Sequence, residues 1–106
     1  MKTLCKITYP AKEIIDARVS KATKGLTRMQ LRILTLLAVV RKESTGYIAS
    51  QCQCGNVSAA VTAMQEHLRK HGLFIRNYYP ETGLKNKFGE PTRAHIWELV
   101  GYQEGE

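Results

Sequence analysis

Long apolar segments, paired cysteines and clustered glycines are scarce in this chain of 106 residues, and each scarcity excludes a class of protein. No apolar run approaches the roughly 20 residues that a membrane-spanning helix needs, and residues 1–6 lack the apolar core of a signal peptide. The three cysteines are an odd number, and Cys52 and Cys54 are too close in sequence to favour a mutual disulfide. We therefore expect reduced thiols in a cytoplasmic protein that has no membrane partner.

Patterns of catalytic residues are also missing. The eight glycines are scattered at expected turns, so they form no loop that could hold a phosphate group. Acidic residues are few, and none pairs with a histidine at a spacing that suggests a catalytic triad or an acid–base pair. A chain of this length also has room for only one domain core. We expect a protein that is not an enzyme and binds no cofactor.

Positive charge is what the sequence has in excess. Sixteen Lys and Arg residues against nine acidic residues give a formal net charge of +7 and an isoelectric point near 9.5. Residues 1–55 hold ten of the basic and three of the acidic residues, whereas residues 56–106 hold six of each, so the first half carries the whole surplus. A surplus of this size on a small surface favours a polyanionic partner, and nucleic acid in particular.

Two helical patterns occupy most of the first half of the chain. After a short strand or extended arm over residues 2–9, a helix is predicted from Pro10 and ends at Gly25. Thr27 is suited to cap a second helix, which has the strongest apolar periodicity of the chain and stops in the polar cluster 41–46. The positions that line one side of these helices are Ala11, Ile15, Val19 and Ala22, then Leu26, Gln30, Ile33, Leu37 and Val40, with Leu34 and Leu36 widening the second face.

A short helix, a turn and a longer helix follow. Residues 47–51 predict the short helix, after which Gly55 is expected to supply the sharp turn. Asn56 is a good N-cap, because its side chain can accept a hydrogen bond from the free amides of the next turn. The helix that it starts is predicted to close at His71, with Gly72 in the left-handed position.

Two strands and a loop complete the chain. The segments 73–79 and 93–100 are rich in aromatic and branched residues and predict strands, and the polar segment 80–91 predicts the loop between them. The last residues, 101–106, are expected to form a frayed tail.

This order of elements resembles the winged helix-turn-helix domain of MarR-like transcription regulators. Residues 26–34 are similar to the opening of their first core helix and residues 56–62 to the start of their recognition helix. Residues 68–76, with the pattern Leu-x-x-x-Gly-Leu, are similar to the segment that leads from that helix into the wing. One departure is clear, because MarR-like proteins add C-terminal helices for dimerisation and this chain ends just after the second wing strand.

The resemblance implies an α+β fold that is mainly α. The expected winged helix-turn-helix is a three-helix core plus a two-stranded β-wing, preceded by an extra N-terminal helix. Residues 1–25 would form the N-terminal arm and helix, residues 26–100 the winged helix-turn-helix domain, and residues 101–106 a flexible tail.

The helix over residues 56–71 has two contrasting faces on a helical wheel. Val57, Val61, Met64 and Leu68 gather on one side, whereas the early turns of the other side carry only small residues. Small residues let a helix enter the major groove, where Ser and Thr hydroxyls can bond base edges and methyl groups can contact thymine. The alternative is an ordinary exposed helix surface. The residues of this outer side are Ser58, Ala59, Thr62, Ala63, Glu66 and Lys70.

We therefore predict binding to double-stranded DNA, with a role as a small transcription regulator such as a repressor. The outer side of the recognition helix lacks arginine in its first two turns, so phosphate contacts must come from elsewhere. The N-terminal Lys12, Arg18, Lys21 and Lys24 either contribute to DNA binding or form a solvated face. The predicted DNA-binding residues are Asn56, Ser58, Ala59, Thr62, Glu66 and Arg69 on the recognition helix, Lys85, Asn86, Lys87 and Arg93 in the wing, and Arg28 and Arg32 on the first core helix.

A possible zinc site also lies in this half of the chain. Cys52, Cys54, His67 and His71 have the spacing C-x-C-x12-H-x3-H, one residue short of a zinc-finger signature. Ser58 stands where such fingers carry an aromatic core residue, and the surrounding chain has its own apolar core. We therefore favour no metal, with the histidines flanking the buried stripe and the cysteines packed in the turn.

Two other functions and the assembly remain open. The chain is also compatible with a replication or maintenance factor of a phage or plasmid, or with a winged-helix module for protein interaction. A homodimer through the N-terminal helix would present two recognition helices to DNA, with Ile14, Ile15 and Val19 as the apolar area. Removal of residues 1–24 is then expected to leave a folded monomer. The alternative for these apolar residues is that they cover the domain's own core.

Overall fold

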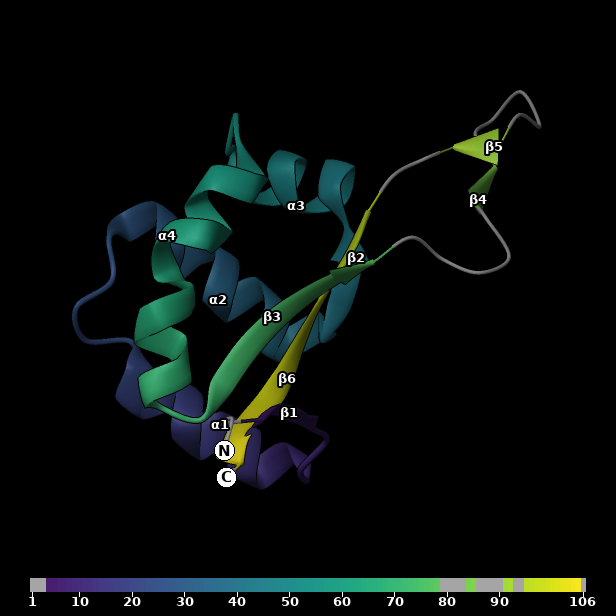
Figure 1. Cartoon of the computed structure of the whole chain (residues 1–106). Helices are drawn as coiled ribbons and strands as arrows, with labels where there is room; N and C mark the ends of the chain where they lie inside the picture. The colour runs from purple at the N-terminus through teal and green to yellow at the C-terminus, as the bar shows by residue number, and fades with distance from the viewer. Residues whose placement is uncertain (1–3, 79–83, 86–90, 93–94, 106) are drawn as a thin grey trace.

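Four helices form in the part of the chain that the structure, a computed structural model, describes: residues 4–78, 84–85, 91–92 and 95–105 (Figure 1). The N-termini of three of these helices, all but the first, are capped by side chains. Thr27 and Gln30 form a reciprocal capping box, Ser44 accepts from the amide of Tyr47, and Asn56 accepts from the amide of Ala59. The helices are α1 (Lys12–Ala22), α2 (Arg28–Val40), α3 (Thr45–Cys52) and α4 (Val57–Lys70).

A small antiparallel sheet is built around the last strand. β6 pairs along one edge with β3 and along the other edge with two short strands, β2 near its start and β1 near its end. A separate pair, β4 with β5, lies apart from this sheet (Figure 1). The strands are β1 (Leu4–Thr8), β2 (Lys42–Ser44), β3 (Leu73–Tyr78), β4 (Leu84–Lys85), β5 (Pro91–Thr92) and β6 (Ile96–Gly105).

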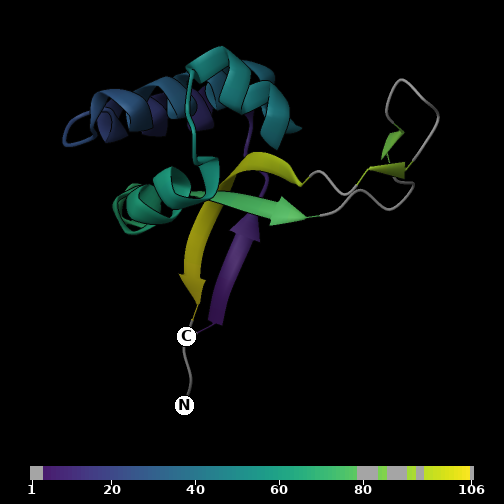
Figure 2. The same cartoon turned by 90° about the horizontal axis from the view of Figure 1, so that it is seen from above.

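The sheet differs from the sequence prediction at three points. The polar segment 41–46 was expected to be only a helix end, but Lys42–Ser44 form β2 and pair with Ile96–Glu98. The prediction of a frayed tail is wrong for residues 101–105, because β1 supplies backbone hydrogen-bond partners along this stretch (Figure 2). The expected two-stranded hairpin is therefore part of a four-stranded sheet.

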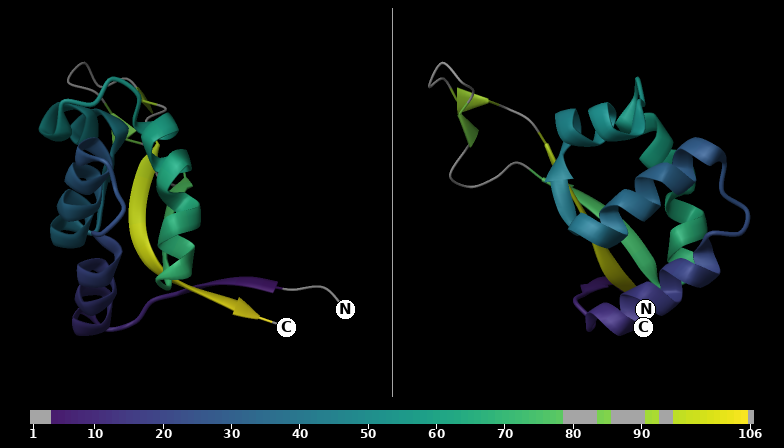
Figure 3. Two further views of the ribbon diagram at one scale, coloured as in Figure 1. Left: turned by 90° about the vertical axis from the view of Figure 1, so that its left-hand side faces the viewer. Right: turned by 180° about the vertical axis from the view of Figure 1, so that it is seen from behind.

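One apolar core joins the helices to one face of the sheet (Figures 2 and 3). The predicted stripes of α1, α2 and α4 all contribute to it, so the predicted boundary at residue 25 does not separate two packing units. The fully or almost fully buried residues of this core include Ile15, Ala22, Ile33, Leu34, Leu37, Ile48, Val57, Val61, Met64, Leu68, Leu73, Ile75, Trp97 and Leu99.

The apolar area expected to support a homodimer is mostly used inside the chain. Ile15 and Val19 are buried in the core, whereas Ile14 on the neighbouring face of α1 is 46% exposed. The prediction that Ile15 and Val19 form a dimer surface is therefore wrong, because the helix turns both side chains towards α2 and the sheet.

Candidate nucleic-acid interface

The helix-turn-helix unit consists of α3, the turn 53–56 and α4. Gly55, which was predicted to supply the sharp turn, lies in a bend of this segment, and the residue with the left-handed conformation is Gln53 (φ 53°). The amides of Gln53 and Cys54 both donate to the carbonyl oxygen of Ala49, which closes the end of α3. Cys52 and Cys54 are buried beneath the turn, so the unit is held to the core on its inner side.

The outer face of α4 is exposed along its whole length. Ser58, Ala59, Thr62 and Ala63 present only hydroxyls and methyl groups over the first two turns. The opposite face is fixed by Val57, Val61, Met64 and Leu68, whose side chains are at most 3% exposed. The predicted contrast between the two faces is therefore present in the structure.

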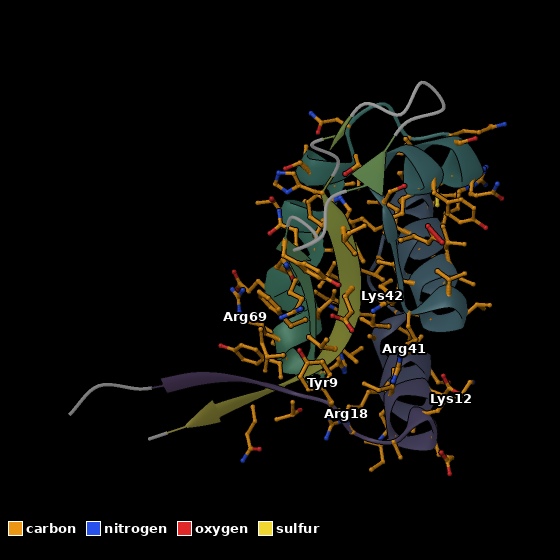
Figure 4. All side chains as sticks on the ribbon, turned by 90° about the vertical axis from the view of Figure 1, so that its right-hand side faces the viewer. Tyr9, Lys12, Arg18, Arg41, Lys42 and Arg69 are labelled. Carbon is orange, nitrogen blue, oxygen red and sulfur yellow. The ribbon has the colours of Figure 1, made fainter. Side chains whose placement is uncertain are left out.

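Of the other residues predicted to bind DNA from this helix, Asn56 caps the helix, and Glu66 and Arg69 are charged. Asn56 is exposed, but its side-chain oxygen is occupied as the N-cap, 3.0 Å from the amide nitrogen of Ala59. Glu66 lies 3.9 Å from Lys70 in a highly exposed ion pair of the kind that contributes little to stability. Arg69 is exposed at the C-terminal end of the helix, where Figure 4 shows it on the α4 side of the sheet.

Basic residues at the end of α1 and in the turn after it lie close to the end of α4. The ring nitrogen Nε2 of His67 lies 2.9 Å from the carbonyl oxygen of Ala22, which joins the last turns of the two helices. Lys21 and Lys24 are exposed beside this contact, and Arg69 and Lys70 are exposed on α4. We call these four residues the basic cluster: Arg69 and Lys70 are at the C-terminal end of α4, and Lys21 and Lys24 flank Ala22, which His67 contacts.

Arg28 and Arg32 lie elsewhere. They are on the side of α2 turned away from its buried stripe and line a groove of about 570 Å³ between α2 and α3. α2 and α4 pack against each other through their buried faces, and the left view of Figure 3 shows α2 on the left and α4 on the right. Ile33 and Leu37 point into the core that α2 shares with α4, and Arg28 and Arg32 lie on the other side of α2. The structure therefore does not bring Arg28 and Arg32 together with the outer face of α4.

The wing residues are described only in part. Lys85 belongs to β4, which pairs with β5. Asn86, Lys87 and Arg93 lie outside the described residues.

The sheet face away from the core carries charges that the sequence prediction did not include. Arg76 on β3 bonds Glu98 on β6 at 2.9 Å and lies over the ring of Tyr78, 4.3 Å from its centre. Burial lowers the pKa of Arg76, but the contacts with Tyr78 and Glu98 outweigh this effect and raise the pKa overall, so the guanidinium stays charged. Lys42 on β2 stands opposite Glu98, and Figure 4 shows Lys42 and Arg41 on the α2 side of β6. Strand alternation in β3, with Leu73 and Ile75 buried, was the signal that could have placed Arg76 on this face.

The cysteines and histidines occupy separate places. Burial, followed by the neighbouring Cys54, raises the pKa of the Cys52 thiol against the opposing effect of Arg32, so the thiol stays protonated at neutral pH. His67 contacts α1 as described, and its ring lies 4.9 Å from that of His71. Within the described ranges, no group of three or more His, Cys, Asp or Glu side chains is placed to hold a metal ion.

Among the helices that the structure describes, none combines the length and the apolar character needed to cross a membrane. Comparison with protein-family models, with curated proteins and with solved structures finds no match to this chain.

Proposed function

We propose that this protein binds double-stranded DNA with the outer face of α4 in the major groove, in the manner of a winged helix-turn-helix regulator. The observation that carries the proposal is the exposed, small-residue surface of Ser58, Ala59 and Thr62 on a helix whose other face is fully buried. A helix with side chains is about 10–12 Å across and the major groove is about 12 Å wide, so small outer residues favour close approach to the bases.

Charge supports the same partner. The net charge of +7 favours a polyanion. The basic cluster Lys21, Lys24, Arg69 and Lys70 lies at the C-terminal end of the helix whose first turns carry the proposed reading face, about 16 Å along the helix axis from Ser58. Phosphate contacts supply most of the affinity of DNA-binding proteins, whereas contacts with base edges supply sequence preference. We infer that the cluster binds phosphates beside the groove and that the hydroxyls of Ser58 and Thr62 contact base edges.

The order of elements also agrees with the proposal. The helix-turn-helix unit α3–α4 is followed directly by β3, which pairs with β6. The long connection between these two strands includes β4 and β5. In a winged helix-turn-helix this connection is the wing. Small DNA-binding domains of this kind suit operator binding in transcription control, and the same binding would serve maintenance of a phage or plasmid.

The double variant Ser58→Glu with Thr62→Glu tests the proposal. Two carboxylates on the outer face of α4 would meet the negative groove, so we expect DNA affinity to fall by about tenfold or more, given about 1–3 kcal/mol for each good base contact. Binding is measured by fluorescence anisotropy on duplexes selected from a random pool with the unaltered protein.

The control is Thr35→Glu with Val39→Glu, which adds the same charge to the exposed side of α2. Circular dichroism should show that both variants stay folded, because all four positions are exposed. Equal loss of DNA affinity in the two double variants would show that α4 is not the helix that contacts the bases.

A further inference from the structure

α2 carries two apolar stripes, and only one of them faces the core. Ile33, Leu34 and Leu37 are buried, whereas the opposite side of the same helix presents Leu31, Leu36 and Val39 to the groove between α2 and α3. Val39 is 75% exposed. Leu36 also packs against the edge of the core, but the exposed parts of these aliphatic side chains form an apolar surface, and such surfaces mark sites of interaction.

Two arginines stand beside these aliphatic residues. Arg28 and Arg32 line the groove and are exposed, and neither has an ion-pair or hydrogen-bond partner within the described residues. The other lining residues are neutral: Leu31, Thr35, Leu36, Val39, Gln51 and Cys52. The groove therefore offers an apolar floor with two available guanidiniums and no acidic lining residue.

We propose that this groove binds an acidic amphipathic helix of a partner protein. The aliphatic residues would receive the apolar stripe of that helix, and Arg28 and Arg32 would pair with carboxylates beside the stripe, since guanidinium groups favour bidentate binding of carboxylates. The lining positions from Arg28 to Val39 extend over about 16 Å of α2, which matches about three turns of a partner helix. An apolar floor is poorly suited to nucleic acid, which offers phosphates rather than a hydrophobic face.

The groove is lined by residues of α2 and α3 and by none of α4. A partner helix bound there would leave the outer face of α4 free. The protein could therefore bind this partner whether or not it binds DNA, so the two proposals stand or fall separately.

The experiment uses synthetic peptides as probes. A fluorescein-labelled helical peptide of about 14 residues carries leucines at i, i+3, i+4, i+7 and i+11 with flanking glutamates, and a second peptide has lysines in place of the glutamates. We expect saturable binding of the acidic peptide, seen as a rise in anisotropy, and weak or no binding of the basic one.

Matched variants locate the binding. Arg28→Glu with Arg32→Glu reverses the charge at the groove. It should lower the affinity for the acidic peptide by about tenfold or more and raise the affinity for the basic peptide. Lys21→Glu with Lys24→Glu makes the same change in net charge away from the groove and should change peptide affinity by about threefold at most. Val39→Asn, a change at an exposed position with no change in charge, should also weaken the acidic peptide.

Three results would overturn the proposal. One is equal binding of the two peptides, and another is equal loss of acidic-peptide affinity in the two charge-reversal variants. The third is a dimer of the unaltered protein in sedimentation that Val39→Asn converts to monomer, which would make a second copy of the chain the occupant. The same variants are also titrated with DNA. Peptide affinity bears on the groove proposal and DNA affinity bears on the proposed function, so failure of one is distinguished from failure of the other.

Discussion

At the scale of single residues, polar side chains that bond the backbone hold the candidate reading helix in place. Gln65 on α4 uses its amide group as both donor and acceptor towards the backbone of Ile75 in β3, with its oxygen 3.1 Å from the amide nitrogen. Ile75 pairs with Leu99 on the other edge of β3, so Gln65 takes the place of a further strand. Through this contact the sheet fixes α4 at its middle, as Asn56 does at its start.

Replacement of Gln65 by methionine should destabilise the fold. The change keeps the length of the side chain but leaves both backbone groups of Ile75 without their partner, which costs about 1–3 kcal/mol. Urea unfolding followed by circular dichroism gives the free energy of unfolding. Glu66→Gln on the exposed side serves as the control and should alter it by less than about 0.5 kcal/mol. A Gln65→Met protein as stable as the control would show that these two hydrogen bonds add nothing.

At the scale of elements, α4 and the pair β4 and β5 are held differently. α4 is packed on its inner face against α2 and β3, so its position is determined by the core. β4 and β5 pair with each other and lie apart from the main sheet (Figure 1). A change in β4 is therefore not expected to alter how α4 is held.

The wing prediction follows from this difference. Lys85→Ala with Lys87→Ala should weaken binding to all duplexes to a similar degree, because contacts with phosphate or the minor groove hold little base information. The measurement compares anisotropy titrations on a selected duplex and on a shuffled one. A loss confined to the selected duplex would instead assign base reading to these lysines.

At the scale of the whole molecule, the N-terminal residues belong to the same folding unit as the rest. β1 pairs with the last strand of the sheet, and Ile15, Val19 and Ala22 of α1 are part of the common core. The earlier expectation that removal of residues 1–24 leaves a folded monomer is therefore replaced. A chain without these residues would lose a strand and expose the surfaces that α1 covers.

We expect the chain that lacks residues 1–24 to have no cooperative urea transition. A pair of point variants tests the same packing within the intact chain. Ile15→Ala should cost about 2–5 kcal/mol because Ile15 is fully buried, whereas Ile14→Ala at the half-exposed neighbouring position should cost much less. Similar unfolding free energies for the two variants, or a cooperative transition in the shortened chain, would contradict a shared core.

The excess of positive charge is also a property of the whole molecule. If four to eight phosphates are neutralised, the logarithm of the DNA binding constant should fall against the logarithm of salt concentration with a slope of about −4 to −7. Anisotropy titrations between low and moderate salt measure this slope. A flat response would reject the electrostatic contribution and favour protein interaction as the function.

The sequence determined the features that depend on neighbours along the chain. Thr27 and Asn56 cap helices because a side-chain oxygen reaches amides of the next turn, and Val57, Val61, Met64 and Leu68 share a face because of the helical period. The strands 73–78 and 96–100 were also predicted from their local composition. The two faces of α4, on which the candidate site rests, come from this local information.

Tertiary structure decided which surfaces those elements cover. Lys42–Ser44 form a strand because they pair with β6, which comes from a distant part of the chain. Residues 101–105 form a strand because β1 pairs with them. Apolar periodicity marks Ile15 and Val19 as a stripe but cannot distinguish a dimer surface from the chain's own core. The same limit applies to Arg28 and Arg32, since a helical wheel shows that they share a side of α2 but not that α3 turns that side into a groove away from α4.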